Sequence, residues 1–323
     1  MATATLRALA AEWGVSGAAS MDHLTKEAGI LQVAEAISAS HGMSHKHKRL
    51  DALPVFTIIN PGDSVGDTTV DYDIYTTDLK IVKCNQSEPA DIVVDWPAGK
   101  AAYFNGQRPA YLEAFGQQLA KIVYYGTNSD FGNVTGFTGL HQLAKAYGNV
   151  IQEGGTTGSR NTIFVVKFRS GSNGCGILFD PAISSSGEMM NSEIMLGGMK
   201  TFEVTDTSGS LKKTVYWVEH LGKAAFLSTS RYDIAAYTQL EDAGSMRPTA
   251  ARMDELIDMV RFSGDSTFLF MNRLTRRILQ LLKDSKLIIQ PGETEYYKWL
   301  ETWAGVPIII DGNLVSNETN VLD

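Results

Sequence analysis

The chain is poor in cysteine and has no long apolar run. Its two cysteines, Cys84 and Cys175, lie far apart in the sequence and form no CxxC pair of the kind that binds zinc or exchanges disulfides. We therefore expect two buried free thiols in a reducing compartment. No apolar stretch approaches the roughly 18 residues of a membrane-spanning helix, and the first residues lack the order of a signal peptide. These absences predict a soluble protein that is made inside the cell and has no membrane partner.

The common enzyme signatures are also missing from the sequence. It contains no GxSxG nucleophile elbow, no HExxH zinc motif and no GxxxxGK(S/T) phosphate loop. Two glycine-rich segments, 154–160 and 171–176, precede predicted strands, whereas a phosphate-binding or dinucleotide-binding loop follows one. We therefore predict that the chain is not an enzyme and has no catalytic residue, cofactor or metal.

Histidine and basic residues supply the next candidates for a site. His41, His45 and His47 include an i, i+4 pair that suits a divalent metal, but their polar surroundings favour a solvated loop. The run 45–49, HKHKR, is the only dense basic patch in the sequence. Three interpretations of this run stay open: a solvated linker, ion pairs with an acidic hairpin of a neighbouring subunit, and contacts with nucleic acid phosphates.

Basic residues are outnumbered by acidic ones, 28 to 36, which gives a net charge of −8. This balance argues against DNA binding as the main function, because neutralising phosphates requires a basic face. Residues 51–100 alone carry nine acidic and three basic side chains, so a charge of −6 lies in this segment. It is either a solvated strand face or a projecting hairpin whose acidic side meets a basic surface on another subunit. A long two-stranded arm is only marginally stable alone and would need such a partner.

The strongest positive signal is a helix near the middle of the chain. Pro109 suits a first helical position, where its missing N–H has no intrahelical partner. Apolar side chains then recur at helical spacing at Leu112, Phe115, Leu119 and Ile122. Gly126 follows at the position where a left-handed residue ends many helices. We predict a long helix over about residues 107–126.

The other segments alternate between helical and extended patterns, which predicts the α+β class. Apolar periodicity indicates two N-terminal helices over about residues 2–13 and 21–38, followed by a polar connection. Two further helices are predicted over 252–260 and 268–282. Strand patterns occupy residues 55–60, 68–76, 79–83, 90–96, 162–168, 175–179, 199–204, 215–218 and 306–310.

Nine sequence blocks stand in a characteristic order along nearly the whole chain. They are LTKEAGILQVAEAISAS, LPVFTIINPGDSVG, FNGQRPAYLEAFGQQLAKIVYYG, FTGL, TIFVVKF, GILFDP, YWVEHLGKAAFLSTSRYDIAAYTQLED, FLFMNRLTRRIL and WAGVPIIIDGNLVSNETNVL. In this order they resemble the major capsid proteins of short-tailed bacteriophages, which have the Hong Kong 97-like capsid fold. The resemblance implies a structural protein that self-assembles into hexamers and pentamers. These would form the icosahedral shell around the double-stranded DNA genome of a phage.

The resemblance also implies a division of the chain. Residues 1–49 would form an N-terminal arm, and residues 50–96 an extended loop (the E-loop hairpin) with flanking strands. Residues 97–128 would form a peripheral domain that contains the long spine helix. Residues 129–323 would form the axial domain, with some peripheral-domain strands interleaved around 199–240. The protein would be assembled in the host bacterial cytoplasm and located in the capsid of the virion.

Partners and contact residues follow from the resemblance and from the charges. The implied partners are other copies of the chain, a separate scaffold protein, a portal, a decoration protein, and packaged DNA held by loose non-specific contact. Arg108 and Glu113 match the arginine and glutamate with which the family starts its spine helix. The acidic extended loop and the segment HGMSHKHKR depart from the family, which tends to an arginine-rich loop and an asparagine-rich arm. The candidate intersubunit contacts are Lys46, Lys48, Arg49, Asp63, Asp67, Asp71, Asp73, Asp78, Arg108 and Glu113.

Two other functions stay open. An encapsulin-like nanocompartment shell would share the architecture but enclose a cargo enzyme, and a requirement for a scaffold protein would distinguish the phage shell from it. A hydrolase with an unrecognised site would instead be a small monomer or dimer with a polar pocket around His141 or His220.

Overall fold

The structure is a computed structural model of the chain. It describes residues 28–52, 56, 58, 60, 64, 66, 71–128, 135–155, 158–180, 190–194, 200–206, 209–261, 266–282, 287–291 and 299–318. The predicted helix 2–13 and the first part of the predicted helix 21–38 lie outside the described residues. The end of the second helix was predicted wrongly: Gly29–Val33 forms helix α3, but Ala36–Ser38 forms strand β1. Parallel pairing with strand β7, Cys175–Phe179, outweighs the helical periodicity there.

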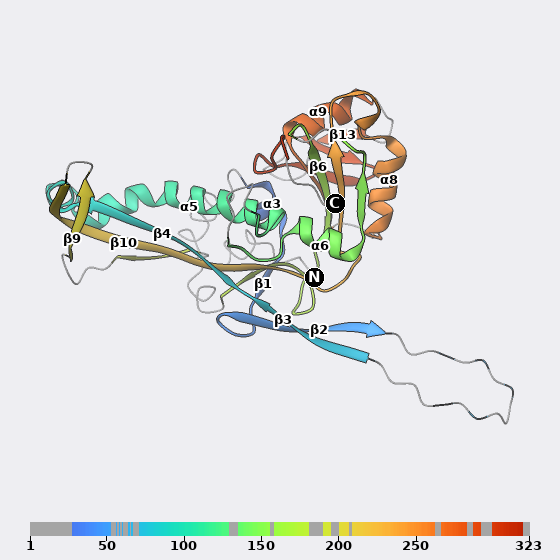
Figure 1. The fold of residues 1–323 in the computed structure, drawn as a ribbon, viewed down its shortest axis with the longest axis horizontal. Coiled ribbons are helices and arrows are strands. Elements are labelled where there is room, and N and C mark those ends of the chain that lie inside the picture. Colours follow the sequence, from blue (N-terminus) through green and yellow to red (C-terminus); the bar gives the residue numbers. More distant parts are fainter. Residues whose placement is uncertain are drawn as a thin grey trace.

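A long helix and a long strand run side by side through one half of the molecule (Figure 1). Helix α5 spans Lys100–Tyr125 and extends along strands β10, Gly209–Ser228, and β4, Lys80–Pro89. The predicted apolar stripe is confirmed, because its four side chains are at most 7% exposed. The helix also ends as predicted at Gly126, whose φ of 63° costs a glycine little.

The start of α5 was predicted wrongly, because Pro109 lies inside the helix. A proline leaves the carbonyl four residues earlier without an intrahelical donor. That carbonyl belongs to Asn105, which is exposed, so water can satisfy it. The turns before Pro109 are held by packing, because Phe104 forms a small buried cluster with Val93 and Val218. Tertiary contact thus extends the helix beyond the segment that local sequence favours.

Strands β4 and β10 belong to a six-stranded sheet with the path β1–β7–β10–β4. Strands β8, Met190–Ile194, and β9, Lys200–Asp206, both pair antiparallel with β10. The segment 90–96 was predicted as a strand, but Ala90–Val94 forms the short helix α4. The sheet ladder ends at this point, because Val215 pairs with Pro89 as the last register partner of β4.

A seven-stranded sheet forms the compact part at the right of Figure 1, in the order β13–β14–β15–β12–β6–β11–β5. Its strands are β5 Val150–Gln152, β6 Asn161–Lys167, β11 Ile234–Leu240, β12 Thr267–Met271, β13 Leu287–Pro291, β14 Trp299–Trp303 and β15 Val306–Ile310. The accompanying helices are α6 Leu140–Tyr147, the 3-10 turn η2 Gly244–Met246, α8 Ala250–Met259 and α9 Arg273–Leu281. The predicted helix 268–282 was therefore wrong in its first part, which is β12. The side chain of Asn272 accepts a hydrogen bond from the N–H of Thr275 at 2.7 Å and starts α9.

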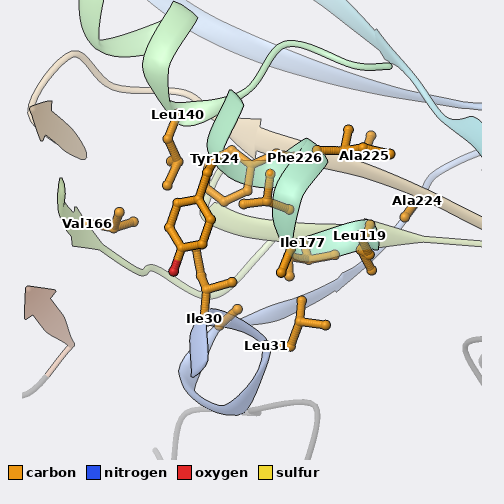
Figure 2. Packing of buried hydrophobic residues seen from close by; sticks show 14 of the residues in the cluster. Ile30, Leu31, Leu119, Tyr124, Leu140, Val166, Ile177, Ala224, Ala225 and Phe226 are labelled. Atoms are coloured by element: carbon orange, nitrogen blue, oxygen red, sulfur yellow. The ribbon is translucent and has the colours of Figure 1, made fainter. Parts of the chain in front are cut away.

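Both faces of the seven-stranded sheet are buried, as alternate residues of β6 show. Ile163 and Val165 belong to the cluster formed with α8 and α9. Phe164 and Val166 point the other way, into the cluster that contains Tyr124 of α5. Figure 2 shows this second cluster, where side chains from α3, α5, α6 and both larger sheets meet. One continuous core therefore joins the long helix to both sheets.

Candidate assembly interface

A two-stranded hairpin projects from the body of the molecule (Figure 1). Its strands are β2, Ser44–Ala52, and β3, Asp71–Asp78, which pair antiparallel from Ser44 opposite Asp78 to Ala52 opposite Asp71. The polar connection that we predicted before residue 50 is therefore a strand for most of its length. The basic run pairs with the acidic strand of its own chain, so neither a solvated linker nor a loop describes it.

One face of β2 is buried at the base of the hairpin. The backbone N–H of Ser40 donates to Nδ1 of His45 at 3.1 Å, and Nε2 of His45 lies 2.8 Å from the carbonyl oxygen of Ser172. Nε2 therefore carries the proton of this ring. The ring of His47 stacks on Tyr75, with centroids 6.0 Å apart. Both histidines were predicted to be solvated, which is wrong, and the described residues contain no His, Cys, Asp or Glu group that could hold a metal.

The charged candidates of the hairpin lie on two faces. Lys46 and Lys48 are exposed on one face, opposite Thr76 and Ile74 in the ladder. Asp73 and Asp78 are exposed as well, and Asp73 is the register partner of Arg49. Asp71 is the partner of Ala52, whereas Asp63 and Asp67 lie outside the described residues. Contacts of these residues with another subunit stay a prediction.

Apolar side chains of the hairpin are strongly exposed, which the charge pattern did not predict. Ile74 of β3 is 69% exposed, and between the strands Phe56 and Ile58 are 92% and 101% exposed. Met43 and Ile81, near the base, are about half exposed. Exposed large apolar side chains also occur elsewhere in the described residues, but the three most exposed ones, Phe56, Ile58 and Ile74, belong to the hairpin. Exposed apolar side chains that cluster are typical of interaction surfaces. We call Phe56, Ile58 and Ile74 the hairpin apolar set.

Helix α5 carries the other two candidates, Arg108 and Glu113, and both are half-buried. Next to them the ring of Tyr111 stacks on His220 of β10 at a centroid distance of 4.4 Å. Burial, and secondarily the charge of Arg108, lowers the pKa of His220, whose Nε2 lies 3.2 Å from Oε1 of Gln86. The structure therefore places Arg108 where helix α5 packs against the six-stranded sheet. The two candidates do not lie on the hairpin with the others.

The two histidines of the hydrolase hypothesis have different surroundings. His220 lines a cavity of about 140 Å³ between β4 and α5, together with Tyr111 and Cys84. Cys84 is exposed, so our prediction of two buried thiols holds only for Cys175. His141 is buried beside Tyr125 and Phe164 in the main core. Burial, and secondarily the charge of Lys145, lowers its pKa to about 4, so the ring is neutral and packs as an aromatic.

Among the buried carboxylates that sequence reasoning missed, Asp311 and Glu318 contact the end of helix α5. Asp311 accepts hydrogen bonds from the hydroxyl of Tyr124 at 3.0 Å and from the N–H of Ile30 at 2.9 Å. Glu318 accepts one from the hydroxyl of Tyr125 at 3.0 Å. These bonds tie the end of α5 to the C-terminal segment across the core. No local sequence pattern predicts these hydrogen bonds, because donor and acceptor lie 187 to 281 residues apart in the sequence.

Comparisons with known proteins give a likeness of fold. No family model and no curated protein matches the sequence. A chain in the structure of bacteriophage Epsilon15 is similar with a TM-score of 0.56 and 15% identity, over 90% of this chain and 88% of that one. The bacteriophage JBD30 capsid is similar with a TM-score of 0.49 and 11% identity, over 88% and 90% of the two chains. The SrpI encapsulin of Synechococcus elongatus is similar with a TM-score of 0.45 and 9% identity, over 66% of this chain and 87% of that one.

In the described part of the chain, no helix is both long and apolar enough to cross a membrane.

Proposed function

We propose that this chain, which has the Hong Kong 97-like capsid fold, is the major capsid protein of a phage. Copies of it would assemble into hexamers and pentamers and form the icosahedral shell around double-stranded DNA. The protein would be located in the virion after assembly in the host bacterial cytoplasm. It would act as a structural building block and not as an enzyme.

The observation that carries the proposal is the exposure of the hairpin apolar set. Burying an apolar side chain of the size of Ile or Phe stabilises a protein by about 1.5–3 kcal/mol. The chain leaves Phe56, Ile58 and Ile74 in water, and Ile74 lies on strand β3 of the hairpin that projects from the body (Figure 1). A neighbouring copy that covers them would recover this energy. The likeness to the chain in bacteriophage Epsilon15 supports the same conclusion, because it extends over 90% of this chain.

The shape of the molecule supports closed assemblies. A projecting hairpin and the surface that receives it are different patches, so their contact is heterologous, and heterologous contacts close into rings at a suitable rotation. Six- and five-membered rings are the units that the proposal requires. Because each copy would make several such contacts, a shell can be stable although each single contact is weak.

Other partners belong to the proposal as well. A separate scaffold protein would guide assembly, a portal would occupy one vertex, and a decoration protein could bind the outer surface. Packaged DNA would be held loosely, since a net charge of −8 disfavours tight contact with phosphates. Arg108, Glu113 and the charged residues of the hairpin stay proposed contacts between subunits.

The test is to express the chain alone and with candidate scaffold proteins and to examine the products by negative-stain electron microscopy. Closed shells, tubes or hexameric rings are expected. A requirement for a scaffold would favour the phage shell, whereas shells that form alone and retain a cargo enzyme would favour the encapsulin alternative. Small monomers or dimers under all conditions would contradict both.

A matched pair of variants tests the part played by the hairpin. Ile74 and Thr76 are both β-branched, both exposed and on the same face of β3. Ile74→Ser removes an exposed apolar side chain, whereas Thr76→Ser makes the same final residue without that loss. We expect Ile74→Ser to form few or no shells at an unchanged melting temperature, and Thr76→Ser to assemble normally. Equal assembly of the two variants would show that Ile74 is not covered in the shell.

A further inference from the structure

Two arginines and a tyrosine form an exposed cluster at the turn between β10 and β11. The guanidinium groups of Arg231 and Arg261 both donate to the phenolic oxygen of Tyr232, at 2.6 and 2.9 Å. Their Cζ atoms lie 4.8 and 3.7 Å from the centroid of the tyrosine ring. Arg261 follows the end of helix α8, so the fold brings it to the turn from a separate part of the chain.

No carboxylate in the described part of the chain lies within ion-pair distance of these two guanidinium groups. Asp233, which is close in sequence, forms a two-point ion pair with Arg169, at 2.9 Å from Nε and 2.7 Å from Nη2. A further cation lies nearby, since Nζ of Lys167 donates to the carbonyl oxygen of Arg261 at 3.2 Å. Two positive charges that share one oxygen repel each other, and a bound anion would relieve this repulsion.

The lowered pKa of Tyr232 is consistent with a positive potential at the cluster. Its pKa lies below the ordinary value, mainly because of the hydrogen bond from Arg231, and the charges of Arg231 and Arg261 act in the same direction. The hydroxyl accepts from both arginines and still has its own proton to donate. The cluster therefore presents N–H and O–H donors together, with positive charge behind them.

We propose that Arg231, Tyr232 and Arg261 form a phosphate-binding site that contacts the phosphodiester backbone of nucleic acid. The inference rests on the proposed function, in which the shell encloses DNA. A guanidinium group offers parallel N–H donors that match two oxygens of a phosphate, and it keeps its charge at every physiological pH. The phenolic O–H supplies a further donor for a remaining oxygen.

The exposure of the cluster favours a polymer over a small anion. Arg231 and Arg261 are exposed, and the cavities of about 270, 360 and 140 Å³ in the described part of the molecule are lined by other residues. One open site would bind free phosphate weakly. A shell would present the same site on every subunit, and many weak phosphate contacts along one polymer add together. Such contacts hold DNA without sequence preference.

The test compares two double variants with the same loss of charge. Arg231→Gln with Arg261→Gln removes both cations of the cluster, whereas Arg247→Gln with Arg277→Gln removes two arginines that lie beside Asp242. Binding of a short fluorescein-labelled DNA duplex to the full chain is measured by anisotropy over a series of salt concentrations. We expect the cluster variant to bind on the order of tenfold more weakly near 0.1 M salt, with a salt slope smaller by about 1 per arginine. The control should keep most of the affinity, and equal losses in the two variants would overturn the site.

Two further experiments distinguish phosphate binding by the cluster from contacts of its arginines with a neighbouring copy. Inorganic phosphate at constant ionic strength should displace DNA from the wild type more strongly than chloride does, and this excess should vanish in the cluster variant. Loss of shells in the cluster variant alone, seen by electron microscopy, would mean that the arginines bind carboxylates of a neighbouring copy, which overturns the phosphate assignment. Normal shells with unchanged DNA binding would also overturn it while leaving the proposed function intact. Failure of the wild type to form shells, alone or with any candidate scaffold protein, would instead contradict the proposed function.

Discussion

Glu318 is fully buried and accepts hydrogen bonds from the hydroxyls of Tyr125, at 3.0 Å, and Thr162, at 2.6 Å. Burial raises the pKa of its carboxyl from 4.5 to about 7, against the lowering effect of both hydrogen bonds and of the charge of Arg160. In the unfolded chain the pKa returns to its ordinary value. The folded protein therefore binds a proton that the unfolded chain has already lost, and the stability that this carboxyl contributes is lost as the pH rises from about 4.5 through about 7.

Replacing Glu318 with Gln should remove this pH dependence, because the amide keeps the shape and an acceptor oxygen but does not titrate. We expect the wild type to lose about 3 kcal/mol more stability than Glu318→Gln between about pH 4.5 and pH 7.5. The free energy of unfolding is measured with urea over this range, before assembly. His141 acts in the opposite direction, since its lowered pKa makes the protein less stable as the pH falls. Both proteins contain His141, so the difference between them isolates Glu318, and parallel profiles would contradict the prediction. The exposed Glu255→Gln is the control.

At the scale of elements, the two ends of α5 are glycines with positive φ. A Cβ on Gly126 would lie 2.4 Å from Oε1 of Gln142 and 2.6 Å from the backbone nitrogen of Gly139, at the start of α6. A Cβ on Gly99, where φ is 84°, would meet nothing within 4 Å. Alanine substitutions at Gly99 and Gly126 therefore separate the cost of the backbone conformation from the cost of close packing.

We expect Gly99→Ala to destabilise the chain by about 1–3 kcal/mol, because its backbone conformation suits only glycine. Gly126→Ala should cost about 1–3 kcal/mol more, since the start of α6 must also shift. Urea unfolding of the two variants before assembly gives the comparison. Equal losses would mean that the contact between the end of α5 and the start of α6 is loose.

Elements with a continuous apolar run could be predicted from the sequence. The strands β6, β7 and β15 lie where we predicted them, because strands that are buried on both faces read as apolar runs. Strand β2 could not be predicted in this way. Its buried residues, His45 and His47, are polar residue types like the exposed Lys46 and Lys48 with which they alternate, so the sequence shows no apolar–polar alternation there.

The candidate site could be predicted from the sequence only in part. The alternating pattern of residues 68–76 predicted a strand, and strand β3, Asp71–Asp78, overlaps most of it. None of the three interpretations of the basic run included its pairing with this acidic strand of the same chain, which the structure shows. The cluster of Arg231, Tyr232 and Arg261 has no sequence signal, because tertiary packing alone brings its second arginine to the turn.

At the scale of the whole molecule, the chain has a body with a large buried core and a two-stranded hairpin that projects from it. The seven-stranded sheet is buried on both faces, and the long helix joins it to the six-stranded sheet through one core. The hairpin has two strands and an exposed apolar set, so its backbone hydrogen bonds can open without unfolding the rest. Assembly should therefore change the stability of the two parts to different degrees.

Hydrogen exchange followed by mass spectrometry measures this difference. We expect peptides of β2 and β3 to become strongly protected when the wild-type chain assembles into shells, because a neighbouring copy would cover them. Peptides of β6, β11 and β12 should change little, since their amides are already buried in the single chain. The unassembled reference is Ile74→Ser, which should exchange at the hairpin as the free wild type does. A uniform gain over the whole chain would mean that assembly stabilises the body as a unit, and that the hairpin is not the element through which copies hold each other.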